Sequence, residues 1–251
     1  MAEKTGIEWT DSTWNPLRAR NLATGKIGWH CEHASEGCRF CYAEGINKRR
    51  GTGLDFKPGH RADVEIFLDE KMLLAPLRWK KPRMIFVNSM SDTFAEFVPD
   101  EMIDRIFAVM ASSARHTFQV LTKRPARMRK YLAGIEAEAP ERLRQYMEVS
   151  REARQALTPP MSEPDPPTPE LRALYDRVDG EIPKLDEYHW RKWPLHNIWL
   201  GVSSERQQEA DERIPDLLAT PAAVRFVSLE PLLGPIALGV GSGTARCPFP
   251  P

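Results

Sequence analysis

From about Arg83 onward the chain alternates short apolar runs with segments whose apolar residues recur at helical spacing. The stretch Arg83–Asp92 is a short apolar run that ends in polar residues, a pattern typical of a buried strand. The stretch Pro99–Ala111 opens with proline and acidic residues and then predicts a helix. Its apolar positions are Met102, Ile103, Ile106, Phe107 and Met110. Together the two segments predict one strand–helix unit.

The same kind of unit recurs along the chain. Apolar runs at 117–125, 197–205 and 224–234 predict further strands, and helices are expected through Met128–Leu132 and over about 207–219. A fifth strand is expected before the cysteine-rich loop at 30–45, inside an otherwise loop-like region that covers residues 1–60. Parallel strands need a crossover that is long enough for a helix. The predicted fold class is therefore α/β with a parallel sheet.

Residues 134–196 interrupt this alternation with a long charged excursion. Two helical stretches flank the proline-rich segment Pro159–Pro169, and proline at that density is incompatible with a helix interior. We interpret the excursion as an exposed insertion, with a catalytic lid as the alternative. The predicted organisation is one domain over 1–238 that carries this insertion, followed by a Gly/Pro-rich tail at 239–251.

Composition narrows the classes of function. The chain has 251 residues, of which 41% are hydrophobic, and its 35 Lys+Arg residues balance its 35 Asp+Glu residues. This neutrality gives no electrostatic indication of a nucleic-acid partner, although it leaves room for a local basic site. No apolar run is long enough for a membrane span, and the polar start does not resemble a secretory signal, so we expect a cytoplasmic protein without a membrane partner.

Three of the four cysteines form the cluster Cys31-x6-Cys38-x2-Cys41. In a reducing compartment clustered cysteines more often bind metal than form disulfides. One interpretation is a 4Fe–4S cluster held by three thiolates with one open iron, and another is a zinc site completed by His30 or His33. A redox pair of Cys38 and Cys41 leaves the third cysteine unexplained. The fourth cysteine, Cys247, lies in the tail, where we expect a free thiol.

Six motifs in one order give the chain a recognisable likeness. They resemble the phage and prophage family named after gene products thirty-seven and sixty-eight, over residues 6–238. The motifs are Trp14-Asn15-Pro16, the cysteine array through Glu44, Phe86–Asp92, Phe118–Pro125, Trp199–Ser203 and Arg225–Pro235. The cysteine array and the strand–helix repeat are also similar to the radical S-adenosylmethionine superfamily.

That second resemblance implies a fold, cofactors and a chemistry. The fold is a partial (β/α) TIM-like barrel, and the cofactors are a 4Fe–4S cluster on Cys31, Cys38 and Cys41 together with S-adenosylmethionine. An electron passed to the sulfonium would cleave it to a 5'-deoxyadenosyl radical. Phe40, directly before the third cysteine, would pack beside the adenine. The substrate is not implied, and the expected electron donor is a flavodoxin or ferredoxin.

In barrel enzymes the chemistry lies at the carboxyl ends of the strands, so polar residues there are further candidates. For the polar groups of S-adenosylmethionine we select Asn88, Ser203, Glu205 and Glu230, with the two glutamates as first choices. The alternative for each is a solvated loop residue or a helix N-cap. Lys123 and Arg124 fit either an anion site or an ordinary surface.

The carboxyl end predicts an incomplete barrel. Relatives continue past Pro235 with a further strand, whereas residues 239–251 here are too rich in Gly and Pro for a buried strand and helix. We therefore expect an incomplete family member, with the edge of the 224–230 strand exposed or covered by the insertion. Such a truncation can abolish activity even when the cluster forms. The competing function is a zinc-stabilised, non-enzymatic binding module, with nucleic acid as its partner.

Overall fold

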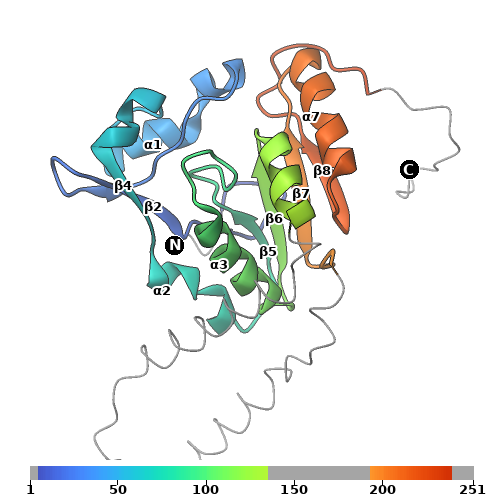
Figure 1. Cartoon of the computed structure of the whole chain (residues 1–251), viewed down its shortest axis with the longest axis horizontal. Coiled ribbons are helices and arrows are strands. Elements are labelled where there is room, and N and C mark those ends of the chain that lie inside the picture. The colour runs from blue at the N-terminus through green and yellow to red at the C-terminus, as the bar shows by residue number, and fades with distance from the viewer. Residues whose placement is uncertain (1–4, 135–192, 239–251) are drawn as a thin grey trace, which may run out of the picture.

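The computed structural model describes residues 5–134 and 193–238 and is built on a five-stranded parallel sheet (Figure 1). The strand order is β1-β5-β6-β7-β8, so neighbours in the sheet follow the order of the chain. The bounds are β1 Ser12–Trp14, β5 Met84–Val87, β6 Thr117–Thr122, β7 Ile198–Ser203 and β8 Val224–Ser228. Every neighbouring pair is parallel.

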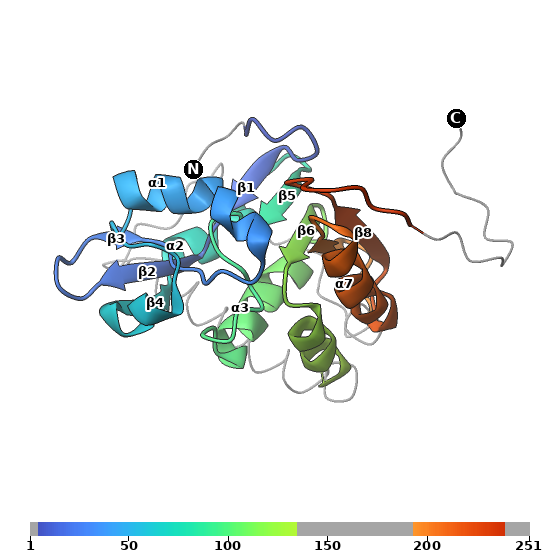
Figure 2. The same ribbon diagram turned by 90° about the horizontal axis from the view of Figure 1, so that it is seen from above.

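Helices cover one face of this sheet and bury the main core. They are α3 (Asp100–Ala111), a helix that begins at residue 125 and continues to the limit of the described segment at 134, and α7 (Gln207–Ala219). Figure 2 shows them in a row on the same side of the strands. Alternate strand residues such as Ile85, Phe118 and Leu200 pack against them and are fully buried. On the other face Trp9 packs on Phe86, with ring centroids 4.8 Å apart.

A second, smaller sheet lies within the amino-terminal region. It is antiparallel, in the order β3-β2-β4, with bounds Ile27–Gly28, Leu17–Asn21 and Val64–Leu68. The expectation that residues 1–60 are mainly loops was therefore wrong for β2 and β3. The remaining elements are short: η1 Glu36–Phe40, α1 Tyr42–Arg50, η2 Pro58–Asp63, α2 Glu70–Leu73 and η3 Pro76–Arg78.

The α/β class and the parallel sheet are confirmed. The four strands expected after residue 83 form, the helix expected over about 207–219 matches α7, and the strand expected before the cysteine loop is β1. The described strands form an open sheet, and no closed barrel is seen among them. Residues 229–238 form no sixth strand.

Two of the sequence predictions fall on other parts of the chain. Most of the predicted insertion and the tail at 239–251 lie outside the described residues, so the domain division stays a prediction. Within the described segments no helix is both long and apolar enough to cross a membrane.

Candidate functional site

The three clustered cysteines lie on one loop between the small sheet and α1. Cys31 follows β3, Cys38 lies within η1, and Cys41 is the N-cap residue of α1. The loop is folded by its own backbone, because the N–H of Cys38 donates to the carbonyl of Ser35 (3.0 Å) and that of Cys41 donates to the carbonyl of Cys38 (3.2 Å). All three thiols are free.

The thiols lie in a half-buried environment with cationic and anionic neighbours. Burial and the nearby Asp92 carboxylate raise the pKa of the Cys31 thiol to about 12, and Arg124 opposes this shift. Burial also raises the pKa of the Cys41 thiol. Hydrogen bonds from the backbone N–H groups of Glu44 and Ala43, in the first turn of α1, oppose this shift. Cys31 and Cys41 pack against a small apolar cluster separate from the main core. Its members are Ala43, Phe56 and Met90.

Asp92, just past the end of β5, organises the sheet edge beneath this loop. Its Oδ1 accepts hydrogen bonds from the hydroxyl of Thr122 (2.7 Å) and the backbone N–H of Phe94 (2.9 Å). Its Oδ2 accepts from the backbone N–H of Lys123 (3.1 Å) and the guanidinium of Arg124 (3.0 Å). A single carboxylate thus connects the carboxyl ends of β5 and β6.

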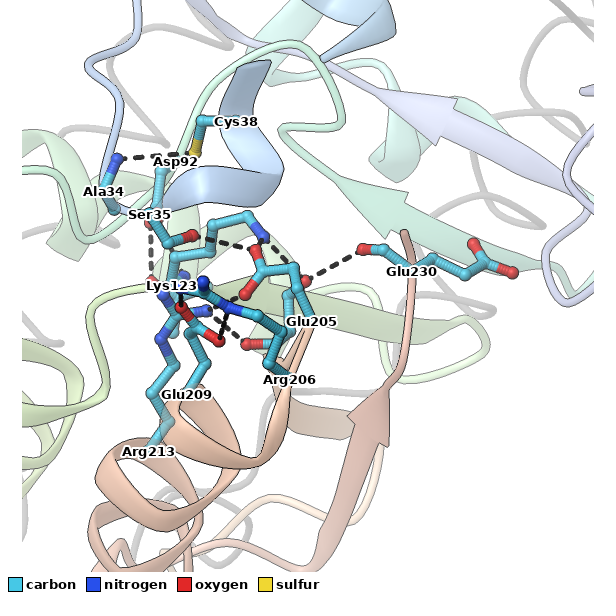
Figure 3. Close-up of polar contacts among 12 residues, drawn as sticks. Ala34, Ser35, Cys38, Asp92, Lys123, Glu205, Arg206, Glu209, Arg213 and Glu230 are labelled. Carbon is cyan, nitrogen blue, oxygen red and sulfur yellow. Dashed lines mark hydrogen bonds and ion pairs between the residues drawn. The ribbon is translucent and has the colours of Figure 1, made fainter. Parts of the chain in front are cut away.

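Glu205, just past the end of β7, is a second buried carboxylate at the same edge. Its side chain is 0% exposed and pairs with Lys123 and with Arg213 of α7, the latter at 3.0 Å (Figure 3). The hydroxyl of Ser35 in the cysteine loop donates to its Oε1 at 2.9 Å. Burial lowers the pKa of Lys123, and a negative charge on Cys38 opposes that shift, which places the thiol within electrostatic range of this ion cluster.

The cysteine loop is tied to the sheet edge by further hydrogen bonds. The guanidinium of Arg124 donates to the carbonyl of Glu32 (2.7 Å), and the hydroxyl of Ser91 donates to the carbonyl of His30 (2.7 Å). The hydroxyl of Tyr42 donates to the carbonyl of Ser89 (2.9 Å). The thiols are therefore held at the carboxyl edge of the parallel sheet, the edge at which parallel α/β folds place their active sites.

Charged side chains of both signs lie at this edge. Among the described residues that contact Asp92 or Glu205, three cationic side chains face two carboxylates. The cations are Lys123, Arg124 and Arg213. The neighbouring pair of Arg206 and Glu209 is balanced. The carboxylate of Glu44, on α1, adds a third negative charge that acts on the Cys41 thiol, so the thiols have both cationic and anionic neighbours.

The predicted cofactor residues fall into two groups. Asn88 and Glu205 are buried and have partners in the chain: Asn88 donates to the Thr93 hydroxyl (2.9 Å), and its φ of 52° places it in the left-handed region that Asn tolerates. Glu230 and Phe40 are exposed. Figure 3 shows the carboxylate of Glu230 pointing away from Glu205.

Ser203 is buried like Asn88 and Glu205, but it contacts Glu230 of the exposed group. Its hydroxyl accepts from the Lys123 ammonium (2.9 Å) and donates to the carbonyl of Glu230 (3.1 Å). It therefore connects the ends of β6 and β8 through the end of β7.

The three thiols are suitable ligands for a metal centre, although their side chains do not converge on one position. Within the described residues no group of three or more His, Cys, Asp or Glu is arranged to hold an ion. The three free thiols belong to one short loop, and, besides burial, the charges of Cys38 and Cys41 help to raise the pKa of Cys31. Thiolates are the ligands of iron–sulfur clusters and of zinc.

The two histidines considered as a fourth ligand differ in their contacts. His33 contacts Glu44, with Nε2 and Oε2 3.0 Å apart. His30 is buried, its ring lies 4.8 Å from that of Phe97, and its Nε2, 3.6 Å from Glu32, has no hydrogen-bond partner among the described residues.

A comparison with known protein families matches residues 4–241, nearly the whole chain, to the family described as "Protein of unknown function (DUF5131)". The chain belongs to this family. No curated protein and no solved structure matches it. The match covers the cysteine loop and both charged strand ends, so the site belongs to the part of the chain that defines the family.

Two important residues of the site escaped the sequence analysis. Arg213 reads as one of many charged residues on a surface helix, yet its side chain is 6% exposed and pairs with Glu205. Ser35 reads as a loop serine. The sequence holds one indication of these contacts, Gly37, which lies directly before the second cysteine. A glycine can mark a place where the backbone lies close to another group.

Proposed function

We propose that this protein is an iron–sulfur enzyme of the radical S-adenosylmethionine type, with Cys31, Cys38 and Cys41 as the cluster ligands. The observation that carries the proposal is the position of three free thiols over the carboxyl edge of a parallel sheet, beside the cationic side chains of Lys123, Arg124 and Arg213. Three thiolates and an oxidised 4Fe–4S core together carry one negative charge, which these cations would help to stabilise. Three protein ligands also leave one metal position open.

The strand order supports the finer fold. Five parallel strands lie in chain order, with the described helices on one face. A doubly wound fold reverses its strand order and carries helices on both faces. A (β/α) barrel adds each strand beside the previous one, so we propose that the described sheet is part of such a barrel.

When bound, the cluster supplies the electron that cleaves the sulfonium of S-adenosylmethionine. The chain's own residues would bind and orient the reactants. Glu230 and Phe40, both exposed near this edge, are available for the cofactor's polar groups and its adenine. Asn88 and Glu205, whose polar atoms have partners in the chain, would support the site indirectly. The proposal also implies an electron donor such as a flavodoxin or ferredoxin.

The proposal is tested by cleavage of the cofactor. Anaerobically reconstituted, reduced protein should convert S-adenosylmethionine to 5'-deoxyadenosine without added substrate. The Cys38→Ser variant should lose this conversion, whereas Cys247→Ser, which removes the cysteine outside the cluster, should keep it. Iron-loaded protein that neither binds nor cleaves S-adenosylmethionine would reject the assignment, and zinc without iron after reconstitution would favour the structural zinc site.

A further inference from the structure

Glu205 occupies an unusual position for a carboxylate. Its side chain is fully buried between β7, α7 and the cysteine loop, and both carboxylate oxygens have partners in the chain. Arg213 and Lys123 approach from the sheet side, whereas Ser35 approaches from the loop. Glu205 therefore bridges the loop that carries the thiols and the sheet edge.

Gly37 lies directly against this carboxylate. A Cβ built on Gly37 would lie 2.6 Å from Oε1 and 2.7 Å from Cδ of Glu205, distances that real side chains do not show. A flexible side chain normally moves aside, but Glu205 is held by two cations and has no solvent to move into. The position therefore needs a glycine because of close packing and not because of its backbone conformation.

We propose that Glu205 is a positioning residue that fixes the cysteine loop to the sheet edge, and we call its contacts with the loop the latch. Gly37 allows this contact, because a glycine leaves room for the Glu205 side chain. The contact fixes where the thiols lie relative to Lys123, Ser203 and the other strand ends. It concerns the docking of the loop in the chain itself, so it holds whichever metal the thiols bind.

The latch differs from an ordinary buried ion pair in one measurable respect. If Glu205 only stabilised the ends of β7 and α7, disturbing its contacts with Ser35 and Gly37 would leave amide exchange of the cysteine loop unchanged relative to β6. If Glu205 forms the latch, the Gly37→Ala substitution matters only while the Glu205 side chain is present, because the atoms it would overlap are those of that side chain.

The test is amide hydrogen exchange on the full-length, chelator-treated chain, comparing residues 35–41 with β6. Gly37→Ala should speed exchange of the loop by roughly tenfold or more while β6 changes little, because a local opening does not require global unfolding. The matched control is Gly45→Ala in α1, where a Cβ would lie no closer than 3.8 Å to Arg49, so loop exchange should change by less than about twofold.

The decisive comparison repeats Gly37→Ala in the Glu205→Ala background. There it should speed amide exchange of the cysteine loop by less than about a further twofold. If that background does not fold, Ser35→Ala serves instead: loss of the hydroxyl donor should speed loop exchange by about threefold or more and leave β6 unchanged. Equal effects of Gly37→Ala in both backgrounds, or a Gly37→Ala or Ser35→Ala loop that exchanges no faster than the Gly45→Ala loop, would overturn the proposal.

Discussion

Asp92 shows how much of the site depends on single buried side chains. Its carboxylate accepts four hydrogen bonds and neutralises Arg124, whose side chain is 14% exposed. Removing it leaves a buried cation and several donors without partners. We therefore expect Asp92→Ala to lower the free energy of unfolding by about 3–5 kcal/mol.

Urea unfolding measures this difference. The matched control is Glu96→Ala in the same loop, whose carboxylate is 76% exposed and lies 4.0 Å from Arg127, and it should change stability by less than about 0.5 kcal/mol. Equal effects of the two substitutions would mean that the hydrogen bonds of Asp92 add no more stability than an exposed ion pair.

Asp55 provides a prediction about pH. Hydrogen bonds from Lys48 and Lys57 lower its pKa from 3.8 to about 2. Its stabilising contribution is thus fully present above about pH 4 and is lost as the pH falls towards 2. Since the pairs are exposed to solvent, the contribution should be below about 1 kcal/mol. Urea unfolding should show Asp55→Asn destabilising the chain at pH 7 and less so at pH 3; an identical difference at both values would contradict this.

At the scale of elements, α1 is held in place by a polar residue. Asn47 is fully buried: its Oδ1 accepts from the backbone N–H groups of Trp29 (2.9 Å) and Thr52 (3.1 Å), and its Nδ2 donates to the carbonyl of Leu54 (3.0 Å). It thereby links α1, which follows Cys41, to the strand that leads into Cys31.

We expect Asn47→Ala to cost at least about 2 kcal/mol, because these backbone groups stay buried without their partner. It should also speed amide exchange of α1 relative to α3. Arg50→Ala on the same helix, with an exposed side chain, is the control and should change stability by less than about 0.5 kcal/mol. An Asn47→Ala chain as stable as the Arg50→Ala chain would show that apolar packing alone holds α1.

The elements also show what the sequence could and could not predict. β5 to β8, α3 and α7 were predictable because buried parallel strands and amphipathic helices leave clear periods. The small sheet was missed partly because β3 has only two residues. β2 does alternate, with arginine at every second position, and this period of two is a strand pattern that the sequence analysis did not use. In the site the cysteines and the strand-end residues Ser203 and Glu205 were predictable, whereas the roles of Asn47 and Arg213 depend on partners that no spacing reveals.

At the scale of the molecule, the thiols are peripheral to the core. The main hydrophobic cluster unites the parallel sheet with its helices and includes none of the three cysteines of the loop. The fold should therefore not depend on a metal. The Cys31→Ser/Cys38→Ser/Cys41→Ser chain should unfold cooperatively by circular dichroism, with a Tm within about 8 °C of the wild-type value. Loss of cooperative unfolding would instead indicate a structural metal site, since such sites contribute folding energy directly.

The central claim is that the three thiols hold an iron–sulfur cluster, and metal analysis of anaerobically purified protein tests it most directly. We predict a brown protein with about four irons and four sulfides per chain. The iron should be lost in Cys31→Ser, Cys38→Ser and Cys41→Ser but kept in Cys247→Ser. One zinc per chain with no iron, both as purified and after anaerobic reconstitution, would contradict the account.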